Sequence, residues 1–441
     1  MSNHSSTTVG ASHQSGPTRV LVAMSGGVDS SVAAALLKQQ GYDVVGVTMR
    51  LYDETPNSKL QTPNLGARRS ALGVLNDGGR GCCGFSGSRD AARVAAKLGF
   101  PHYTWDFRAD FESSVIEDFC AEYGRGRTPN PCLRCNEELK FTQLLDRAPQ
   151  LGAEFIATGH YARIAARDMT GKRGLYRASS RSAGLSPLSG EPGANGGQSL
   201  EVAQGPGKGR SPFAWQLLRG VDVNKDQSYF LYAMNQAQLG RVLMPVGDHT
   251  KAQVRDIARK LDLPVAEKPE SQDICFVPDN DYEAFLRQRR PGLFRSGPVL
   301  DVSGNVLGQH EGIAGFTKGQ RKGLGLAFGE RRYVVRLDPE KNAVVLGTEA
   351  EVRERVVEAG DARWVSGFAP TEPFRAEARV RYQGKGGEAL VEPAGNGRVR
   401  VTFDEPQWAP TPGQAVVFWQ GDTTLGGATI GSECGVRRDG R

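Results

Sequence analysis

The most constraining feature of this chain is a Gly-rich turn between an apolar run and an Ala/Leu-rich segment. The apolar run is Arg19–Met24, the turn is a Ser-Gly-Gly sequence that starts at Ser25, and the segment Ser30–Gln40 is closed by Gly41. A short apolar run predicts a strand, and a longer Ala/Leu-rich segment before Gly predicts a helix. We therefore expect a strand, a tight turn and a helix, in that order.

The same alternation continues along the first third of the chain. Further strands are predicted over Val44–Met49, His102–Trp105 and Phe155–Thr158, and helices over Arg89–Leu98, Phe111–Tyr123 and Glu137–Ala148, with a loop over Thr128–Cys135. Alternating strands and helices indicate an α/β domain with a doubly wound parallel sheet. Ligands of such sheets bind at the carboxyl ends of the strands, so the loops after Met24, Met49 and Thr158 should converge.

The rest of the chain departs from this pattern. Residues 54–80 and 168–211 interrupt it, and their composition is typical of flexible insertions. Helices over Gln227–Leu239 and Thr250–Leu261 suggest a small central domain. From Val299 onward, short alternating runs broken by Gly and Pro predict an antiparallel β-barrel.

A chain of 441 residues is long enough for two or three domains. We expect a disordered tail at 1–18, an α/β domain at 19–215, a central domain at 216–298 and a β-barrel at 299–441. The polar start lacks the apolar core of a signal peptide and no segment is apolar enough to span a bilayer, which predicts a soluble cytoplasmic protein without a membrane partner.

Charge and cysteine usage narrow the function classes. The net charge of +6 suits a polyanionic partner but is also typical of plain solvation. In a reducing compartment the seven cysteines are better candidates for catalysis or metal binding than for disulfides.

The turn after the first strand has the chemistry of a phosphate loop. Backbone N–H groups of Met24 to Ser31 and the following helix N-terminus can cradle an anion, and Asp29 can hold Mg²⁺ against phosphates. Hydroxyls of Ser25, Ser30 and Ser31 can add donors. The string Ser-Gly-Gly-Val-Asp-Ser resembles the pyrophosphate loop of the ATP-pyrophosphatase superfamily, whose members cleave ATP between the α and β phosphates. The chain has no Gly-Lys-Ser/Thr loop, which disfavours transfer of the terminal phosphate.

Cys132 and Cys135 are further candidate site residues. Cys132 and Cys135 end a Pro-containing loop just before a predicted helix, where the helix N-terminus and Arg134 would favour a thiolate. A zinc knuckle would need a second pair, and adjacent Cys82-Cys83 suits chelation poorly. Cys275 is flanked by apolar residues, which is also typical of a small buried hydrophobe. Spacing alone leaves these alternatives open.

Six ordered motifs resemble one family. They are Ser25–Ser30, Gly126–Phe141, Ala157–Tyr161, Asn224–Tyr232, the segment around Cys275, and Gly319–Gly325. Across about 19–430, apart from the two insertions, the chain is similar to the tRNA-specific 2-thiouridylase family. The resemblance implies ATP-dependent adenylation of the wobble uridine of a tRNA, followed by sulfur transfer.

The resemblance also implies residue roles. Cys135 takes the nucleophile position, and Cys275 that of a persulfide carrier loaded by a sulfur-relay protein. The positions implied to contact ATP are Ala23, Met24, Ser25, Gly26, Gly27, Val28, Asp29, Ser30, Met49 and Gly159. Those implied to contact tRNA, the first three beside the target base, are Asn130, Pro131, Cys132, His160, Lys225, Asp226, Gln227, Arg381, Tyr382 and Gln414.

One position departs from the family pattern. Many members have an aspartate, the usual candidate for a general base, where this chain has Cys132. Two mechanisms therefore stay open. In one, Cys275 carries a persulfide that Cys135 resolves by forming a disulfide; in the other, Cys132, Cys135 and Cys275 hold a [4Fe–4S] cluster with one open iron.

Cationic and aromatic residues could serve an RNA partner. Lys318, Arg321 and Lys322 lie in a Gly-rich stretch, and Arg379 and Arg381 share one face of a predicted strand. Tyr382 and Trp419 are candidate stacking platforms for flipped bases, or core aromatics. Two other functions remain: an ATP-pyrophosphatase that forms amides or guanidino groups, and a non-catalytic tRNA-binding protein.

Overall fold

The computed structural model describes residues 16–52, 85–168, 173–174, 213–270, 274–277, 281–325 and 329–431. Nearly all of the predicted tail at 1–18 and of the predicted insertions at 54–80 and 168–211 lies outside these residues, as do Cys82 and Cys83. Across the described ranges, no helix is long and apolar enough to cross a membrane.

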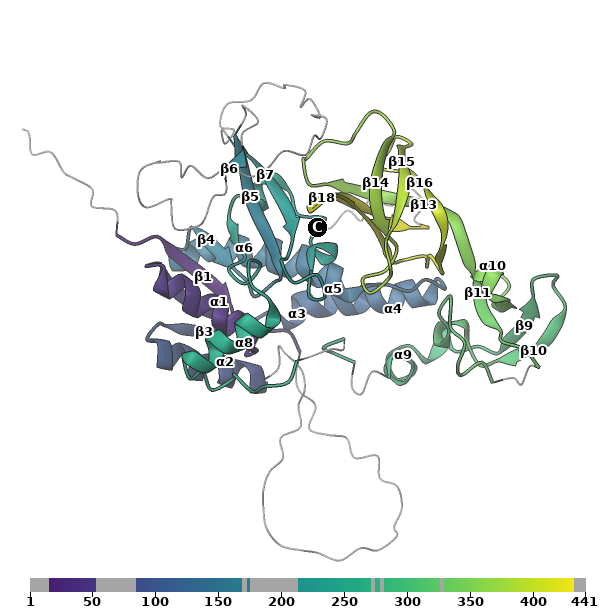
Figure 1. Ribbon diagram of the computed structural model, residues 1–441. Helices are drawn as coiled ribbons and strands as arrows, with labels where there is room; N and C mark the ends of the chain where they lie inside the picture. Colours follow the sequence, from purple (N-terminus) through teal and green to yellow (C-terminus); the bar gives the residue numbers. More distant parts are fainter. Residues whose placement is uncertain are drawn as a thin grey trace, which may run out of the picture.

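The first domain is built on a five-stranded parallel sheet of order β3-β2-β1-β4-β8. Its strands are β1 (Arg19–Ala23), β2 (Asp43–Arg50), β3 (His102–Asp106), β4 (Phe155–Ala157) and β8 (Val242–Leu243). The connections from β1 to β2, from β2 to β3 and from β3 to β4 contain helices, as the alternation in the sequence predicts (Figure 1).

Both faces of this sheet are buried, which makes it doubly wound. Val20 and Val22 of β1 lie in one apolar cluster, whereas Leu21 lies in another on the opposite face. The first cluster includes residues from α1 (Val28–Gln39), α2 (Phe85–Leu98) and α8 (Lys251–Lys260). The second is covered by two long helical segments, at 108–124 and 131–151. The predicted α/β architecture is confirmed.

The two long helical segments consist of several shorter elements in direct succession. The first contains α3 (Arg108–Phe111), η1 (Glu112–Ile116) and α4 (Glu117–Gly124), and the second contains α5 (Pro131–Arg134), η2 (Cys135–Gln143), α6 (Leu144–Arg147) and η3 (Ala148–Leu151). The second begins six residues earlier than predicted, inside the expected loop. Pro131 occupies its first turn, where backbone N–H groups have no partner within the helix, so the missing N–H of proline costs nothing.

A separate four-stranded sheet follows in the chain. Its order is β10-β9-β12-β11, with β9 (Gly297–Asp301), β10 (Val306–His310), β11 (Tyr333–Asp338) and β12 (Ala343–Gly347). Its apolar cluster contains Val299, Val334, Val344 and Leu346. It is preceded by α9 (Tyr282–Arg289) and η7 (Pro291–Leu293), interrupted by η8 (Ile313–Gly315), and followed by α10 (Glu349–Val352).

The C-terminal strands form a closed antiparallel barrel. In order β13-β16-β15-β14-β17-β18, the barrel is closed by pairing of β18 with β13. Its strands are β13 (Arg353–Trp364), β14 (Phe374–Arg379), β15 (Gly387–Pro393), β16 (Val399–Trp408), β17 (Ala415–Gln420) and β18 (Thr423–Ile430). The predicted barrel is confirmed, but the β-rich region expected from Val299 onward is divided between two sheets, because local alternation does not reveal which strands pair.

A hairpin from the first domain extends the barrel sheet. The hairpin strands are β5 (Ala162–Asp168) and β7 (Phe213–Arg219), with β6 (Arg173–Gly174) at the edge. Thr423 and Thr424 of β18 pair with Leu218 and Leu217 of β7. In Figure 1 the hairpin stands between the parallel sheet and the barrel.

The predicted small central domain is confirmed as the four-stranded sheet, but many of the residues expected in it at 216–298 lie elsewhere. β8 joins the parallel sheet beside β4, and α8 covers the same face as α1. The predicted helix over Gln227–Leu239 consists of only η5 (Ser228–Phe230) and α7 (Gln236–Leu239). A two-residue strand carries no periodic signal, so its place in the sheet could not be read from local pattern.

Candidate active site

The predicted phosphate loop joins β1 to the N-terminus of α1. Gly27 caps α1, and Gly26 has a φ of +72°. A Cβ at Gly26 would lie 2.1 Å from the carbonyl oxygen of Gly87 in α2, so only glycine fits. The loop therefore packs closely against α2. The first turn of α1 follows it directly, so the N–H groups of that turn lie beside the loop.

The serines of the loop hold its own backbone. Ser25 N–H donates to Ser30 Oγ at 3.2 Å, Gly27 N–H donates to Ser25 Oγ at 3.3 Å, and Ser31 Oγ donates to the Gly27 carbonyl at 2.8 Å. Ser30 and Ser31 are buried. Their hydroxyls therefore stabilise the loop conformation, a role that the sequence did not predict for them.

The other positions implied to contact ATP surround the loop. A Cβ at Gly159, just after β4, would lie 2.6 Å from the backbone nitrogen of Ser30, so the carboxyl ends of β1 and β4 meet here. Met24 and Met49 are buried below, while Ala23 is half-buried. Val28 is buried in the first turn of α1.

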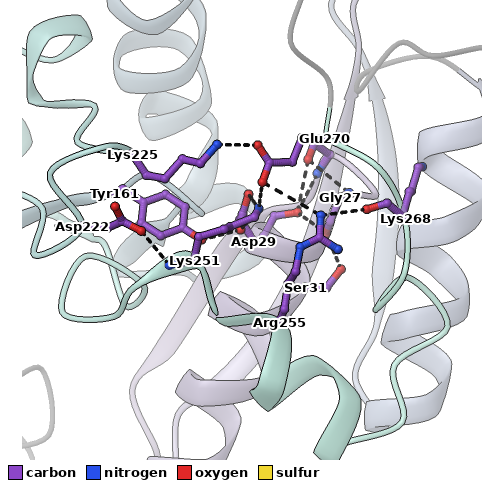
Figure 2. Close-up of polar contacts among 12 residues, drawn as sticks. Gly27, Asp29, Ser31, Tyr161, Asp222, Lys225, Lys251, Arg255, Lys268 and Glu270 are labelled. Carbon is purple, nitrogen blue, oxygen red and sulfur yellow. Dashed lines mark hydrogen bonds and ion pairs between the residues drawn. The ribbon is translucent and has the colours of Figure 1, made fainter. Parts of the chain in front are cut away.

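Asp29 lies at the centre of a network of charged groups (Figure 2). Lys251 Nζ donates to both Asp29 carboxylate oxygens at 2.7 and 2.9 Å, and the Tyr161 hydroxyl donates to Oδ1 at 2.7 Å. Burial and the neighbouring Asp29 charge raise the pKa of Tyr161 well above its ordinary value. The phenol therefore stays protonated and acts as a donor to the carboxylate.

Glu270 gathers further cations beside the loop. Its carboxylate accepts from Lys225 Nζ at 2.7 Å, pairs with Lys251 Nζ at 3.1 Å, and lies 3.9 Å from Arg255. Burial raises the pKa of Glu270, but the hydrogen bonds from Lys225 and Lys251 outweigh it and lower the pKa. Glu270 therefore stays ionised between them.

A second lysine touches the loop itself. Lys268 Nζ donates to the Gly26 carbonyl at 3.1 Å and pairs with Asp90 of α2 at 2.7 Å. No role was predicted from the sequence for Lys251, Lys268, Arg255 or Glu270. They lie more than two hundred residues after the loop, so only the fold brings them together.

The first candidate cysteines lie at the start of the helical segment at 131–151. Asn130 caps α5 by accepting from the Cys132 N–H at 3.2 Å. Cys132 is exposed, whereas Cys135, one turn later, is buried. Arg134 pairs with Asp118 and Glu137 at 3.4 and 3.3 Å, so its charge is shared with two carboxylates.

The barrel holds the backbone that leads to these cysteines. Thr128 N–H donates to the Pro412 carbonyl at 2.8 Å, and Gln414 Nε2 donates to the carbonyls of Thr128 at 2.9 Å and Pro129 at 3.3 Å. A Cβ at Gly413, with φ of +93°, would lie 2.9 Å from the Thr128 oxygen. Gln414, implied to contact tRNA, anchors the 128–130 loop in this structure.

Cys275 and Cys135 belong to the same apolar core. Cys135 is a buried member of the cluster on the face of the sheet that the segments at 108–124 and 131–151 cover, and half-buried Cys275 packs against this cluster. Neighbouring Phe276 anchors that segment by edge contacts with the rings of Phe111 and Phe119, at centroid distances of 5.5 and 5.3 Å. The start of η2 and the Cys275 segment therefore pack on one core, although they come from different parts of the chain.

A three-cysteine metal site does not fit this arrangement. Within the part of the chain that the structure describes, no three His, Cys, Asp or Glu side chains come together in a way that could hold a metal ion. Cys132, Cys135 and Cys275 all lie within that part. As placed here, they do not form the ligand set that a [4Fe–4S] cluster needs.

Several positions implied to contact tRNA are buried and already bonded. His160 Nδ1 lies 2.8 Å from Thr158 Oγ1, and burial lowers the pKa of His160 well below its ordinary value. The Gln227 side chain accepts from the Tyr161 N–H at 2.9 Å. Asp226 accepts from the N–H and the hydroxyl of Ser228 at 3.0 and 2.9 Å. These contacts hold the segment that carries Lys225.

Arg381 and Tyr382, which the resemblance also implies to contact tRNA, make contacts within the protein. Arg381 Nη2 donates to the carbonyls of Lys318 and Ala409 and to Thr411 Oγ1, at 2.9, 3.1 and 2.7 Å. Half-buried Tyr382 packs on Phe230 with ring centroids 4.4 Å apart.

Three further residues named as RNA candidates can also be placed. Trp419 is fully buried and donates to Ser228 Oγ at 3.0 Å, which makes it a core aromatic and not a stacking platform. Arg321 and Lys322 are exposed.

Comparison with known proteins places these elements. The model described as "tRNA methyl transferase HUP domain" matches residues 18–183 and 208–279, the "PRC-barrel domain" of the same series matches 283–348, and an "Aminomethyltransferase beta-barrel domain" matches 354–430. These ranges correspond to the parallel-sheet domain, the four-stranded sheet and the closed barrel. Among solved structures, NMN synthetase from Francisella tularensis is 13% identical with a TM-score of 0.27, over 58% of this chain and 68% of that one.

Curated relatives match almost the whole chain. A protein of Carboxydothermus hydrogenoformans named "tRNA-specific 2-thiouridylase MnmA" is 46% identical over 415 residues, covering 94% of this chain and 98% of the relative. A protein of the same name from Pelotomaculum thermopropionicum is 45% identical, with 94% and 98% covered. With three domains matched in order and this identity over nearly the full length, the chain belongs to the tRNA-specific 2-thiouridylase family.

Proposed function

We propose that the chain is a tRNA-specific 2-thiouridylase that uses ATP to replace the C2 oxygen of a wobble uridine with sulfur. The observation that carries the proposal is the pairing of two sites in one domain. The Ser25–Ser30 loop lies at the carboxyl end of the parallel sheet, and Cys135 and Cys275 pack on one core that covers a face of that sheet. A tRNA substrate is consistent with the predicted cytoplasmic location.

Adenylation makes the uridine oxygen a leaving group. The O2 oxygen attacks the α-phosphorus of ATP, the bond to the bridging oxygen of the β-phosphate breaks, and pyrophosphate leaves. Gly26, Gly27 and the first turn of α1 would cradle the phosphates. Mg²⁺ would neutralise phosphate charge, with the half-exposed Asp29 carboxylate as its protein ligand.

Sulfur then replaces the adenylated oxygen. A sulfur-relay protein loads Cys275 as a persulfide, and the Cys135 thiolate attacks the Cys275 sulfur to form a disulfide. This releases hydrosulfide, which attacks C2 of the uridine; AMP departs with the original oxygen and the hydrosulfide proton passes to solvent. An external dithiol reduces the Cys135–Cys275 disulfide before the next cycle.

Cys132 takes no part in persulfide loading or in disulfide formation in this proposal. It is exposed at the start of α5, in the position of an aspartate in many family members, and would serve beside the target base. The alternative in which it joins Cys135 and Cys275 on an iron–sulfur cluster is tested by anaerobic purification with iron and sulfide analysis. Full activity of an iron-free Cys132→Ser protein with a persulfide donor supports the persulfide route; activity that requires bound iron contradicts it.

A single-turnover assay tests the proposed roles of the two cysteines. Protein loaded with persulfide sulfur is mixed with tRNA and ATP, and pyrophosphate release and 2-thiouridine are measured separately. We expect Cys135→Ala and Cys275→Ala each to abolish 2-thiouridine while pyrophosphate release continues.

Cys120→Ala is the matched control for this assay. Cys120 is buried in the same cluster, and burial raises the pKa of its thiol, so it is a poor nucleophile. Thiolation by both cysteine variants at the parental rate would contradict the roles given to Cys135 and Cys275. ATP cleavage that is unchanged in both variants, with no 2-thiouridine formed even by the wild type, would instead favour an ATP-pyrophosphatase that forms amides or guanidino groups. A wild-type protein that binds tRNA but releases no pyrophosphate would favour a non-catalytic tRNA-binding protein.

A further inference from the structure

Lys251 occupies a position that helix energetics disfavour. It is the first residue of α8, after the cap Thr250, where the helix dipole repels a cation. Its side chain is only 12% exposed, and a lysine is rarely so buried unless it is paired. Its backbone N–H is held by the Asp222 carboxylate at 2.9 Å. Because the helix dipole and burial both disfavour a lysine here, Lys251 is a candidate for a role at the phosphate loop.

The Lys251 ammonium lies between two carboxylates at the mouth of the phosphate loop. It contacts Asp29 at 2.7 Å and Glu270 at 3.1 Å, and the face of the Tyr161 ring lies 5.8 Å away. Figure 2 shows Lys225, Lys251 and Arg255 directed at Glu270 beside Asp29. Glu270 is therefore anchored by several cations, and Lys251 is the one that also reaches the loop residue Asp29.

Electrostatics makes this position important for a phosphate ligand. Without Lys251, the Asp29 and Glu270 carboxylates would both face the β and γ phosphates, and like charges at close range repel. An ammonium has three donor hydrogens, so it can bridge carboxylates and phosphate oxygens together. Its low exposure also means that little hydration is lost when a ligand arrives.

We propose that Lys251 is a substrate-contacting residue that binds the β and γ phosphates of ATP and stabilises the departing pyrophosphate. This role depends on the proposed adenylation. Glu270 would position the Lys251 ammonium. With Mg·ATP bound, Asp29 would hold the metal, and the Lys251 ammonium would donate to the phosphate oxygens. AMP lacks the β and γ phosphates and gains nothing from Lys251.

Equilibrium binding to the full-length protein tests this selectivity. Calorimetry measures the affinity for α,β-methylene-ATP with Mg²⁺, which cannot be cleaved at the adenylation bond, and for AMP. For Lys251→Met we expect affinity for α,β-methylene-ATP to fall roughly 10- to 100-fold, the effect of losing a hydrogen bond to a charged group, and affinity for AMP to change less than about threefold.

Lys97→Met is the matched control, because Lys97 forms a lysine–aspartate pair with Asp262 elsewhere in the same domain. Its affinity for both nucleotides should equal that of the wild type. Should Lys251→Met fail to fold, Lys251→Arg is measured in its place. The guanidinium keeps the charge but changes the geometry, so a smaller loss confined to α,β-methylene-ATP is expected.

The outcomes separate the inference from the proposed function. Equal weakening of both nucleotides, or none, in a folded Lys251→Met protein overturns the phosphate role and leaves Lys251 as a structural link between Asp29 and Glu270. If the wild-type protein binds neither nucleotide, the result contradicts the proposed use of ATP and therefore also the phosphate role of Lys251. Loss confined to α,β-methylene-ATP supports both.

Discussion

At the scale of single residues, the phosphate loop depends on backbone conformation as much as on side-chain chemistry. Gly26 combines a positive φ with a close approach to Gly87, and its carbonyl accepts from Lys268. The serines of the loop are engaged with its own backbone. Substitution at Gly26 should therefore change the shape of the loop even though it removes no polar group.

The change Gly26→Ala tests this requirement against a matched glycine. Gly41 also has a positive φ, of +86°, but a Cβ there would meet nothing within 4 Å. We expect Gly41→Ala to lower the free energy of unfolding by about 1–2 kcal/mol, the cost of the left-handed conformation alone. Gly26→Ala should cost more and abolish nucleotide binding. Equal unfolding energies by urea titration, with nucleotide binding intact, would refute the close-packing account.

His160 predicts a pH dependence of stability. Its folded-state pKa is depressed by burial below the ordinary value of 6.5, so the unfolded chain binds the proton more readily. The stabilising contribution is present above about pH 6.5 and is lost as the pH falls below that value, by at most about 1.4 kcal/mol per pH unit.

Urea unfolding at about pH 7.5 and about pH 5.5 measures this contribution. The wild type should lose more stability on acidification than His160→Gln does. His249→Gln, at a half-exposed position, is the control and should behave as the wild type. Identical losses in the wild type and His160→Gln would show that the ring does not stay neutral when folded.

At the scale of elements, the barrel contributes to the cysteine site through one loop. The Gln414 amide binds the carbonyls that precede α5, so Gln414→Ala should loosen the loop that leads into α5 and Cys132. We expect the rate of 2-thiouridine formation to fall several-fold while affinity for ATP is unchanged. Gln420→Ala, exposed at the end of β17, is the control. A change in tRNA affinity alone would instead favour the direct tRNA contact implied by the resemblance.

Arg381 has a comparable structural role. Its guanidinium binds two backbone carbonyls and Thr411, which links the barrel to Lys318 of the preceding segment. We expect Arg381→Ala to lower the free energy of unfolding by about 1–3 kcal/mol with little change in the salt dependence of tRNA binding. Arg375→Ala, which breaks an exposed pair with Asp404, should lower the free energy of unfolding by much less. A salt slope lowered by about one unit in Arg381→Ala would restore a phosphate contact.

Local patterns predicted elements well where strands and helices were long and apolar. β1, β2, α1 and α8 follow the hydrophobic runs and glycine stops of the sequence. Elements defined by their partners were missed: two-residue β8, and the pairing of β7 with β18 across the chain. For the same reason the site residues in motifs could be proposed from sequence, whereas Lys251 and Glu270 could not, because Lys251 gains its role from contact with Asp29 and Glu270 from contact with Lys251.

At the scale of the whole molecule, the barrel is joined to the parallel-sheet domain at several places, including the three described next. β18 pairs with β7, Gln414 binds the loop before α5, and Trp419 donates to Ser228, whose hydroxyl donates to Asp226. The Lys225 segment is thereby linked to the barrel on one side and to Glu270 on the other. An RNA bound across these domains would meet both the phosphate loop and the cysteine-bearing helix through elements that are already connected.

The central claim is that this chain supplies 2-thiouridine in tRNA, and nucleoside mass spectrometry of a deletion strain tests it most directly. We predict that 2-thiouridine disappears from total tRNA of the strain, returns when the wild-type gene is restored, and stays absent when Cys135→Ala or Cys275→Ala is supplied instead. Normal 2-thiouridine in the deletion strain would contradict the account.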